Sequence, residues 1–197
     1  EQLKSFITSG RWHISGSSWE ASDVLVPSVE SSIRNILLGQ EYYRQEFGVE
    51  STDIFLPDCF GFGWTLPTIA SHCGLIGFSS QKLDWRVNPF YGKSKHPFTI
   101  GLWQGVDGAS IMLAHGYDYG KRWKNVDLSE DEELLKLAGR TPLNTVYRYY
   151  GTGDTGGSPT LGSVNSVEKG IKGSGPLEII SATSDQLFKD LSLIHIS

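Results

Sequence analysis

A short buried strand, a tight loop and a helix follow one another without a break in residues 54–67, IFLPDCFGFGWTLP. Three bulky apolar residues open this stretch and predict a buried strand, which Pro57 ends because proline has no N–H to donate to a sheet. Thr65 is typical of a helix start and Gly74 of a helix end. The apolar residues 75–79 then predict a second buried strand. A strand, a helix and a strand in this order predict a parallel sheet in an α/β domain.

Asp58 comes directly after the first of these strands, where the loop into the helix begins. Parallel sheets collect catalytic groups at the carboxyl ends of their strands, because loops vary there while the strands stay fixed. Glycines and aromatic residues alternate in residues 59–63, which permits a tight loop walled by ring faces. The local pattern leaves two roles open, since an Asp after a proline is commonly a turn former or a helix cap.

A helix over residues 28–47 is the clearest element in the rest of the chain. Ser28 is a typical N-cap, the apolar residues form one stripe, and Gly48 is a typical C-terminal stop. Asp107 and Gly108 form a strong turn signal between two strands, so we interpret Asp107 as a turn residue. The remaining predictions are a helix over 1–10 and strands over 11–19, 98–104, 110–114, 145–150 and 177–181.

Two more helices are predicted from capping boxes, in which two side chains satisfy the free N–H groups of a helix start. Ser129 and Glu132 open the first, which is expected to be a solvated surface helix over 129–139. Thr183 and Gln186 open the second. Its buried side chains are predicted to be Leu187, Phe188 and Leu191.

Composition limits the kinds of partner. The 197 residues suit one domain with a sizeable core, and the net charge is −5, from 17 basic and 22 acidic residues. No basic cluster indicates nucleic acid, and no apolar run is long enough to span a membrane. The two cysteines are too few for a disulfide framework, and no signal peptide is visible, so the sequence assigns no compartment. Six Trp, eight Tyr and nine Phe are a heavy aromatic load for this length, and aromatic faces line sugar-binding clefts as well as cores.

The run LPDCFGFGWTLP, with GRWHISGSSWEASD before it and QKLDW after it, resembles glycoside hydrolase family 38, the retaining alpha-mannosidases. The resemblance spans nearly the whole chain. It implies that residues 1–191 are part of a catalytic domain with a parallel-stranded (β/α) barrel-like fold, truncated at both ends. Residues 192–197, within the terminal LSLIHIS, do not continue the last helical pattern and are interpreted as a non-native tail.

The family resemblance assigns the catalytic pair. It implies that Asp58, in the P-D-x-F-G motif, is the nucleophile and also a ligand of an active-site metal, usually zinc. Asp154, in the glycine-rich run GTGDTGGSP, is implied to be the general acid/base, and Ser158 replaces a glycine of the family pattern. A phosphate-binding loop is the rival interpretation of these glycines, but the run lacks a Walker-type lysine and a dinucleotide fingerprint.

The resemblance also implies contacts with the sugar. Lys82 follows the second predicted strand, where a cation near Asp58 would keep the nucleophile ionised. Asp23 matches an acidic position of the family, although a turn role is equally open. His115 is interpreted as a hydrogen-bonded loop residue rather than a ligand. The implied substrate-binding residues are Phe60, Lys82, Tyr117 and Asp118.

The metal site is where the chain departs from the family. The resemblance implies further ligands, a His-x-Asp pair upstream and a distant downstream His, and neither is present here, so only Asp58 is assigned and the isolated chain is expected to be inactive. Two other classes stay open: a non-catalytic carbohydrate-binding module, and a metal-dependent polysaccharide deacetylase, for which the five histidines offer no suitable pair. The favoured function is retaining hydrolysis of alpha-mannosides in a mannose-containing glycan.

Overall fold

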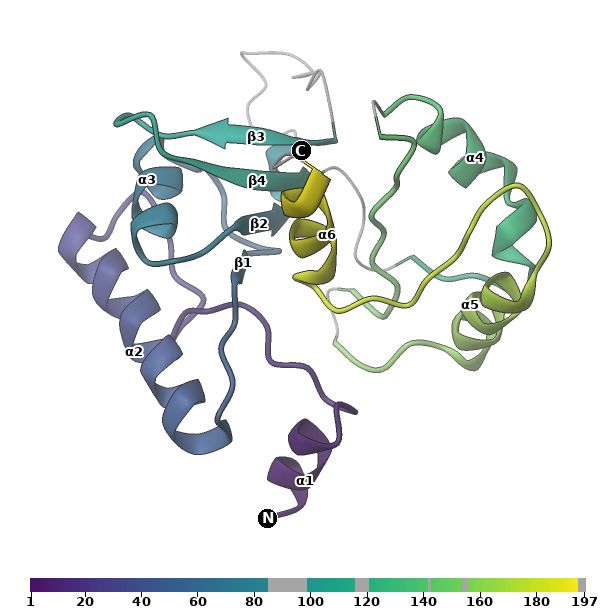
Figure 1. The fold of residues 1–197 in the computed structure, drawn as a ribbon, viewed down its shortest axis with the longest axis horizontal. Helices are drawn as coiled ribbons and strands as arrows, with labels where there is room; N and C mark the ends of the chain where they lie inside the picture. The colour runs from purple at the N-terminus through teal and green to yellow at the C-terminus, as the bar shows by residue number, and fades with distance from the viewer. Residues whose placement is uncertain (85–98, 116–120, 142, 154–155, 195–197) are drawn as a thin grey trace. The chain divides into compact units, whose positions relative to one another are not determined.

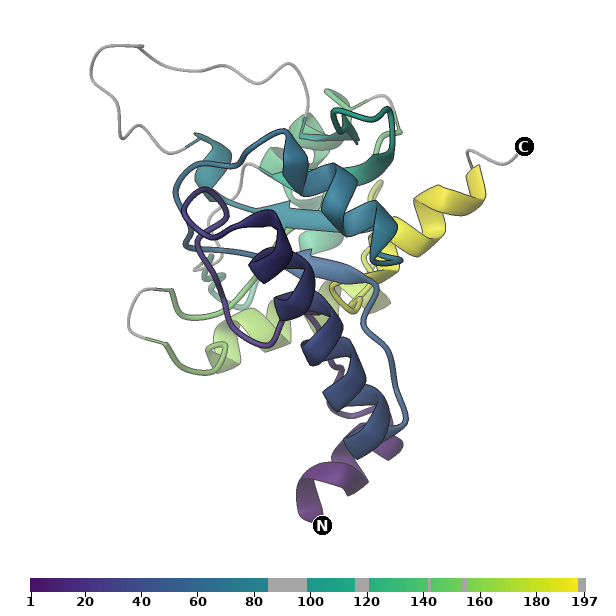
Figure 2. The ribbon, with the colours of Figure 1, turned by 90° about the vertical axis from the view of Figure 1, so that its left-hand side faces the viewer.

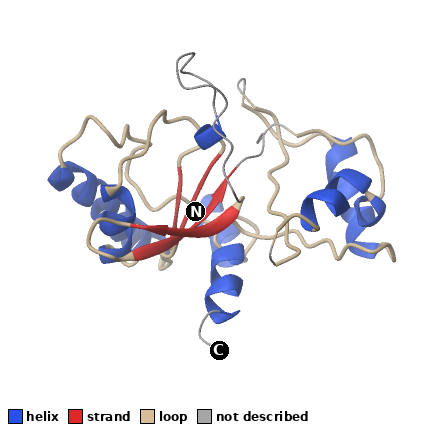
Figure 3. Ribbon diagram, turned by 90° about the horizontal axis from the view of Figure 1, so that it is seen from above, coloured by secondary structure: helices blue, strands red, loops and turns tan. Residues whose placement is uncertain are grey.

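The computed structural model describes residues 1–84, 99–115, 121–141, 143–153 and 156–194. The chain divides into two compact units, which the sequence did not indicate. Glu1–Gly116 and Thr183–Ser197 form unit 1, and Tyr117–Ala182 form unit 2. All described strands belong to unit 1, whereas the described part of unit 2 contains only helices and loops (Figure 3). None of the described helices is long and apolar enough to cross a membrane.

Unit 1 is built on a four-stranded sheet in the order β1-β2-β4-β3 (Figure 1). Strand β1 (Asp53–Phe55) pairs in parallel with β2 (Gly77–Ser80), which pairs in parallel with β4 (Ser110–His115). Strand β3 (Ile100–Gln104) is antiparallel to β4. The predicted strand–helix–strand unit is therefore confirmed, and the described strands form an open mixed sheet.

Helices α2 (Val29–Phe47) and α3 (Thr65–His72) cover one face of this sheet. The Ser28 side chain accepts a hydrogen bond from the Ser31 N–H, and Gly48 ends α2 in the left-handed region at a φ of 68°, as predicted. Phe78 is fully buried between the sheet and the helices. The apolar core on this face comprises Ile36, Ile54, Leu56, Leu66, Ile69, Ala70, Leu75, Phe78, Ile111 and Leu113.

Helix α6 (Gln186–Ile194) packs on the sheet through Phe188. The side chain of Phe188 lies against Gly77 so closely that a Cβ there would sit 2.1 Å from its ring. The predicted capping box is wrong, since the Thr183 hydroxyl donates to Asp185 instead. The prediction that the helical pattern stops at residue 191 is also wrong, because the helix continues to Ile194.

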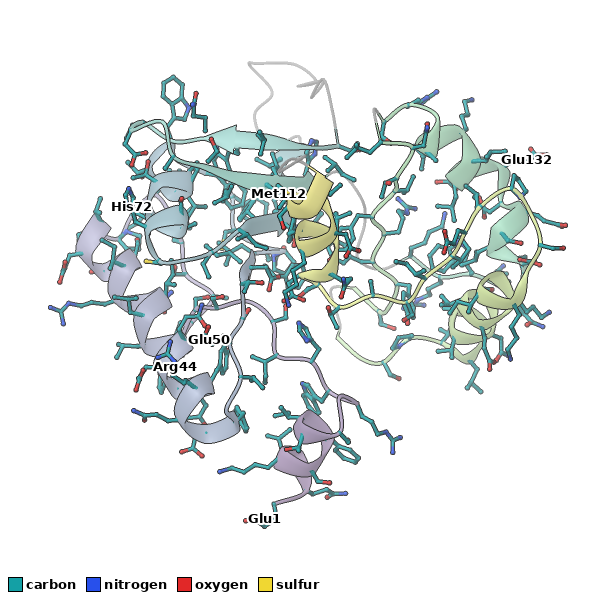
Figure 4. All side chains as sticks on the ribbon, in the orientation of Figure 1. Glu1, Arg44, Glu50, His72, Met112 and Glu132 are labelled. Carbon is teal, nitrogen blue, oxygen red and sulfur yellow. The ribbon has the colours of Figure 1, made fainter. Side chains whose placement is uncertain are left out.

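The β3–β4 hairpin turns at Asp107 and Gly108, as predicted, with Gly108 at a φ of 87°. One oxygen of Asp107 accepts hydrogen bonds from the Ala109 N–H and the Thr68 hydroxyl, and the other lies 2.7 Å from Nε2 of His72. The hydrogen bonds from Thr68 and then His72 lower the pKa of Asp107 to about 2. Asp107 therefore shapes the turn and also ties the hairpin to α3, whose last residue is His72 (Figure 4).

Helix α1 (Gln2–Thr8) lies at the C-terminal end of α2 (Figure 2). An ion pair of 3.1 Å joins Lys4 to Glu46 there. Arg44, labelled in Figure 4, pairs with Glu50 at 3.0 Å and also with Glu41. These pairs are exposed to solvent, so they contribute little to stability.

Unit 2 contains α4 (Glu132–Ala138), α5 (Leu161–Lys172) and a short 3₁₀ helix over Leu128–Glu130. Helix α5 was not predicted from the sequence, although the Thr160 side chain caps it by accepting a hydrogen bond from the Ser163 N–H. Asp131, not Ser129, caps α4. The α4 prediction was also wrong about burial, because Leu134 and Ala138 are buried. Leu134 packs in a small core with Trp123, Leu128 and Val167.

Three predicted strands are wrong: residues 11–19, 145–150 and 177–181 are not in strands. Each segment forms backbone hydrogen bonds outside a strand ladder, and in 145–150 the Thr145 N–H donates to the Thr141 hydroxyl. The Ser17 N–H donates to the Asp53 carbonyl, and the Leu177 N–H donates to the Ser129 carbonyl. Alternating apolar residues in these segments therefore mark one-sided packing of an irregular chain rather than sheet pairing.

Gly39→Ala is expected to lower the free energy of unfolding by about 1–3 kcal/mol, the usual cost of overpacking. Gly39 lies on the buried side of α2, and a Cβ there would sit 2.5 Å from the carbonyl oxygen of Ser17. Urea unfolding of the chain measures this. The matched control is Gly139→Ala, where the nearest atom would lie at an ordinary 3.6 Å. Equal stability of the two variants would show that α2 does not pack this closely on residues 17–19.

Candidate active site

Two charged side chains meet at the carboxyl edge of the parallel strands. Asp58 lies three residues beyond β1, and Lys82 opens the 3₁₀ helix Lys82–Asp84 just beyond β2. Phe55 and Ser79 are register partners in these strands, so both connecting loops leave the sheet at the same edge. The parallel pairing is the reason that residues far apart in sequence lie side by side.

An ion pair of 2.7 Å joins Lys82 Nζ to Asp58 Oδ1. The two partners differ in exposure: the Lys82 side chain is 4% exposed and the Asp58 side chain is 69% exposed. Lys82 also lies over the ring of Phe60, with Nζ 5.1 Å from the ring centroid. A buried cation therefore holds one oxygen of a carboxylate that stays open to solvent.

The end of strand β2 fixes the place of Lys82. All four residues of β2 are buried, and the Lys82 N–H donates a 3.0 Å hydrogen bond to the Ser80 hydroxyl. Burial fixes Ser80, and Ser80 fixes the first turn beyond the strand. The lysine therefore starts from a rigid support, which limits the directions its ammonium group can take.

The loop after Asp58 is anchored on both sides. The Cys59 thiol donates to the Ser22 carbonyl at 3.0 Å, and burial, followed by the charges of Asp23 and Asp58, raises the pKa of this thiol. Gly61 has a φ of 91°, and a Cβ there would sit 2.6 Å from Leu25. The alternation of glycine with aromatic residues thus permits a tight loop, as predicted.

Aromatic rings on this loop point to different environments. Phe62 packs edge-on against buried Phe78, with ring centroids 5.0 Å apart. Phe60, in contrast, is 49% exposed beside the Asp58–Lys82 pair. An exposed ring next to an accessible carboxylate suits stacking on the apolar face of a sugar.

Asp23 takes the turn role that the sequence left open. Its Oδ1 accepts hydrogen bonds from the N–H groups of Leu25 and Val26, at 2.7 and 3.1 Å. This turn presents Leu25 to the loop at Gly61. Asp23 therefore shapes the wall beside Asp58, a role that only the packing reveals.

The interpretation of His115 as a loop residue is wrong. His115 is the last residue of β4, where it is the register partner of Ser80, and it is 5% exposed. Its N–H donates to the Thr99 carbonyl. The apolar run before His115 was the sequence signal for its burial, since the strand simply extends one residue further.

The glycine-rich segment of unit 2 closes on itself. The Thr152 hydroxyl donates to the Ser158 carbonyl at 3.0 Å, and Gly156 and Gly157 have φ values of 69° and 128°. These positive angles explain the glycines. Asp154, which sits in this segment, lies outside the described residues, as do Tyr117 and Asp118.

A zinc site needs about four ligands in tetrahedral geometry. Nowhere in the described parts of the chain do three His, Cys, Asp or Glu side chains gather in a way that holds a metal. Asp58 is the single residue of the predicted ligand set that the chain supplies, and its Oδ1 is paired with Lys82. The described residues therefore do not fit a complete zinc site.

Comparison with known proteins identifies the family. The model of the glycosyl hydrolases family 38 N-terminal domain matches residues 1–193. The chain belongs to glycosyl hydrolase family 38. This family 38 chain is 32% identical over 195 residues to alpha-mannosidase G of Dictyostelium discoideum, covering 97% of the chain and 17% of that protein. It is 30% identical over 197 residues to human alpha-mannosidase 2C1, covering 96% of the chain and 18% of that protein. The chain thus spans less than a fifth of the length of these relatives.

Solved structures show the same fold. The crystal structure of an alpha-mannosidase from Enterococcus faecalis matches with a TM-score of 0.71 at 20% identity, covering 97% of this family 38 chain and 22% of that chain. A 4-alpha-glucanotransferase from Thermococcus litoralis matches with a TM-score of 0.55 at 16% identity, covering 95% of this chain and 28% of that chain. At these identities the likeness describes the fold alone.

Proposed function

We propose that the full-length protein is a retaining alpha-mannosidase that acts on mannose-containing glycans, with Asp58 as its nucleophile. The observation that carries this proposal is the ion pair between exposed Asp58 and buried Lys82 at the carboxyl edge of β1 and β2. The names of the family 38 relatives support the sugar class. Phe60 beside the pair suits the face of a sugar ring.

The chemistry takes two displacements. In the first, a carboxylate oxygen of Asp58 bonds to the anomeric carbon as the glycosidic C–O bond breaks, and Asp154 gives its proton to the departing oxygen. In the second, Asp154 takes a proton from water, the water oxygen bonds to the anomeric carbon, and the bond to Asp58 breaks. Each step inverts the carbon, so the product keeps the configuration of the substrate.

Lys82 prepares Asp58 for the first displacement. The ammonium group binds Oδ1, which leaves the other oxygen of the exposed carboxylate for attack. It also supplies a positive charge that fixes the carboxylate in one orientation, and positioning of reacting groups lowers the barrier before any chemistry occurs. Lys82 is therefore a positioning residue in this proposal. Zinc would need further ligands that this chain does not supply. Neither displacement described here involves the metal.

Lys82→Met in the full-length protein is expected to lower kcat/KM on an aryl alpha-mannoside by about 10²–10³-fold, the range for loss of one preorganised donor. The free energy of unfolding should change little, because methionine fills the space of the buried lysine chain and the carboxylate of Asp58, once unpaired, is solvated. Steady-state kinetics and urea unfolding of the same preparation measure the two effects. Lys82→Arg is the matched control and should recover part of the activity, since it restores the cation.

Full activity in Lys82→Met would contradict the positioning role. Loss of activity that parallels loss of the folded state would instead make Lys82 a structural residue. The two readouts separate these outcomes because they are taken on one preparation.

The function itself is tested by product stereochemistry. The full-length protein should release alpha-mannose first from an aryl alpha-mannoside, as followed by proton NMR before mutarotation. Release of beta-mannose would refute retention. Binding of mannosides without any turnover would favour the carbohydrate-binding module instead.

A further inference from the structure

A second group of charged side chains lies at the opposite end of β1 from Asp58. Its centre is Asp185, which precedes α6 and is fully buried. Asp185 accepts hydrogen bonds from the hydroxyls of Thr183 and Thr52 at 2.8 and 3.1 Å. It also pairs with Lys189 at 2.5 Å and with His13 at 3.0 Å. This carboxylate thus joins α6, the start of β1 and the segment after α1.

Asp53, the first residue of β1, is a second carboxyl group in this region and is also fully buried. Its Oδ1 accepts a 3.0 Å hydrogen bond from the Ser51 hydroxyl. Its Oδ2 has no hydrogen bond that meets distance and angle criteria among the described residues, although the Ser184 hydroxyl and the Gly16 N–H lie near the carboxyl group. No Lys, Arg or His among the described residues forms an ion pair with Asp53, in contrast to Asp185. The surroundings of Asp53 therefore favour its protonated, neutral form, whereas those of Asp185 favour the anion.

The attachment of α6 depends on the same place. Thr52, whose hydroxyl donates to Asp185, directly precedes Asp53 in the sequence. Beyond it, fully buried Phe188 packs on Gly77 of β2. A second negative charge at Asp53 would thus appear where the segment 183–194 is fastened to the sheet.

We propose that Asp53 is uncharged and Asp185 charged in the folded protein, and that ionisation of Asp53 loosens the segment 183–194, which makes its docking on the sheet sensitive to pH. An unpaired charge in a buried position is costly, and a like charge nearby adds to that cost. Release of the segment relieves both, because water then reaches the Asp53 carboxylate.

The pKa directions agree with this geometry. Burial raises the pKa of Asp53, and the charge of Asp185 raises it further, while the nearby hydroxyls of Ser51 and Ser184 and the Gly16 N–H oppose the shift. Burial also pushes the pKa of Asp185 upward, but hydrogen bonds from Lys189 and Thr183 and the charges of His13 and Lys189 leave it below its usual value. The two acids are thus driven in opposite directions.

The sign of the pH effect follows from the raised pKa of Asp53. An acid with a raised folded-state pKa binds its proton more tightly when folded, so folding is penalised as pH rises from about 4, the ordinary Asp value, through the folded-state value. Other groups face the pair. His13 adds a positive charge beside Asp185 only in its protonated form, and Lys189 adds one from α6. Burial and then Asp53 raise the pKa of Tyr43 on α2.

The test is hydrogen–deuterium exchange of residues 186–194 in the 197-residue chain at pH 5 and pH 8, corrected for intrinsic exchange rates. Protection of this segment in the native chain should be at least threefold lower at pH 8. Asp53→Asn, which keeps the shape of the neutral acid, should raise protection at pH 8 and remove most of the difference between the two pH values. Glu20→Gln is the control, because it removes an exposed carboxylate from unit 1 and should preserve the difference.

Three results would overturn the proposal: a weaker α6 in Asp53→Asn at both pH values, an undiminished pH response in that variant, or a failure of that variant to fold. The first and third would mean that Asp53 is needed as an anion, and the second would mean that another group causes the pH response. A carbon-13 titration of the Asp53 carboxyl group gives a second measurement. A midpoint at or below the ordinary Asp value would also refute the proposal.

Discussion

Asp58→Asn is expected to lower kcat/KM of the full-length protein on aryl alpha-mannosides by at least about a thousandfold, as loss of a nucleophile does. The amide cannot form the bond to the anomeric carbon, and it also loses the charge that Lys82 binds at 2.7 Å. Folding should survive, because the Asp58 side chain is 69% exposed and stands in a loop. Kinetics and urea unfolding measure activity and stability separately.

A shortened side chain gives a sharper test of the same role. Asp58→Gly leaves space for a small external nucleophile, so added azide should restore turnover and produce beta-mannosyl azide, the product of a single inversion. Glu20→Gln, which removes an exposed carboxylate elsewhere in unit 1, is the matched control and should keep full activity without azide. Full activity in Asp58→Asn, or no effect of azide on Asp58→Gly, would contradict the nucleophile assignment.

The sequence predicted the centre of the fold well because the signals there are local. Pro57 ends β1, Gly48 ends α2 in the left-handed region, and Gly108 marks the hairpin, each through a backbone restriction that needs no distant partner. The parallel pairing of β1 and β2 then follows from the helix between them. The family membership predicted from the same stretch is confirmed over residues 1–193.

The elements that failed depend on tertiary contacts. Residues 11–19 alternate like a strand, yet Ser17 donates its N–H and its hydroxyl to the carbonyl of Asp53 rather than joining a ladder. Helix α5 was missed because its buried positions are mostly Ser and Gly, with Val167 as its one buried apolar residue; it is held by packing of Val167 and by close approach at Gly170. Closure of the strands into a barrel stays a prediction, since the described strands form an open sheet.

Some features of the candidate site could likewise be predicted from local sequence signals, and others depend on tertiary packing. That Asp58 and Lys82 lie at one edge of the sheet could be predicted, because carboxyl ends of parallel strands meet there. That Lys82 is buried and Asp58 exposed could not, since exposure is set by the chain that covers each group. The roles of Asp23 and Leu25 in shaping the wall were likewise invisible without the packing.

Asp154→Ala is expected to separate substrates by their leaving groups. Loss of a general acid should lower kcat/KM on an alkyl alpha-mannoside by about 10²–10⁴-fold, because the departing alkoxide needs a proton. An aryl mannoside with an acidic phenol should lose far less in the same parameter, since its leaving group departs without protonation. Ser158→Gly is the matched control: it restores the family glycine in the same loop and keeps the carbonyl that accepts from Thr152, so both substrates should be turned over normally. An equal loss on both substrates in Asp154→Ala would show that Asp154 supports the loop rather than transferring the proton, and the general acid would then have to be sought outside the glycine-rich segment.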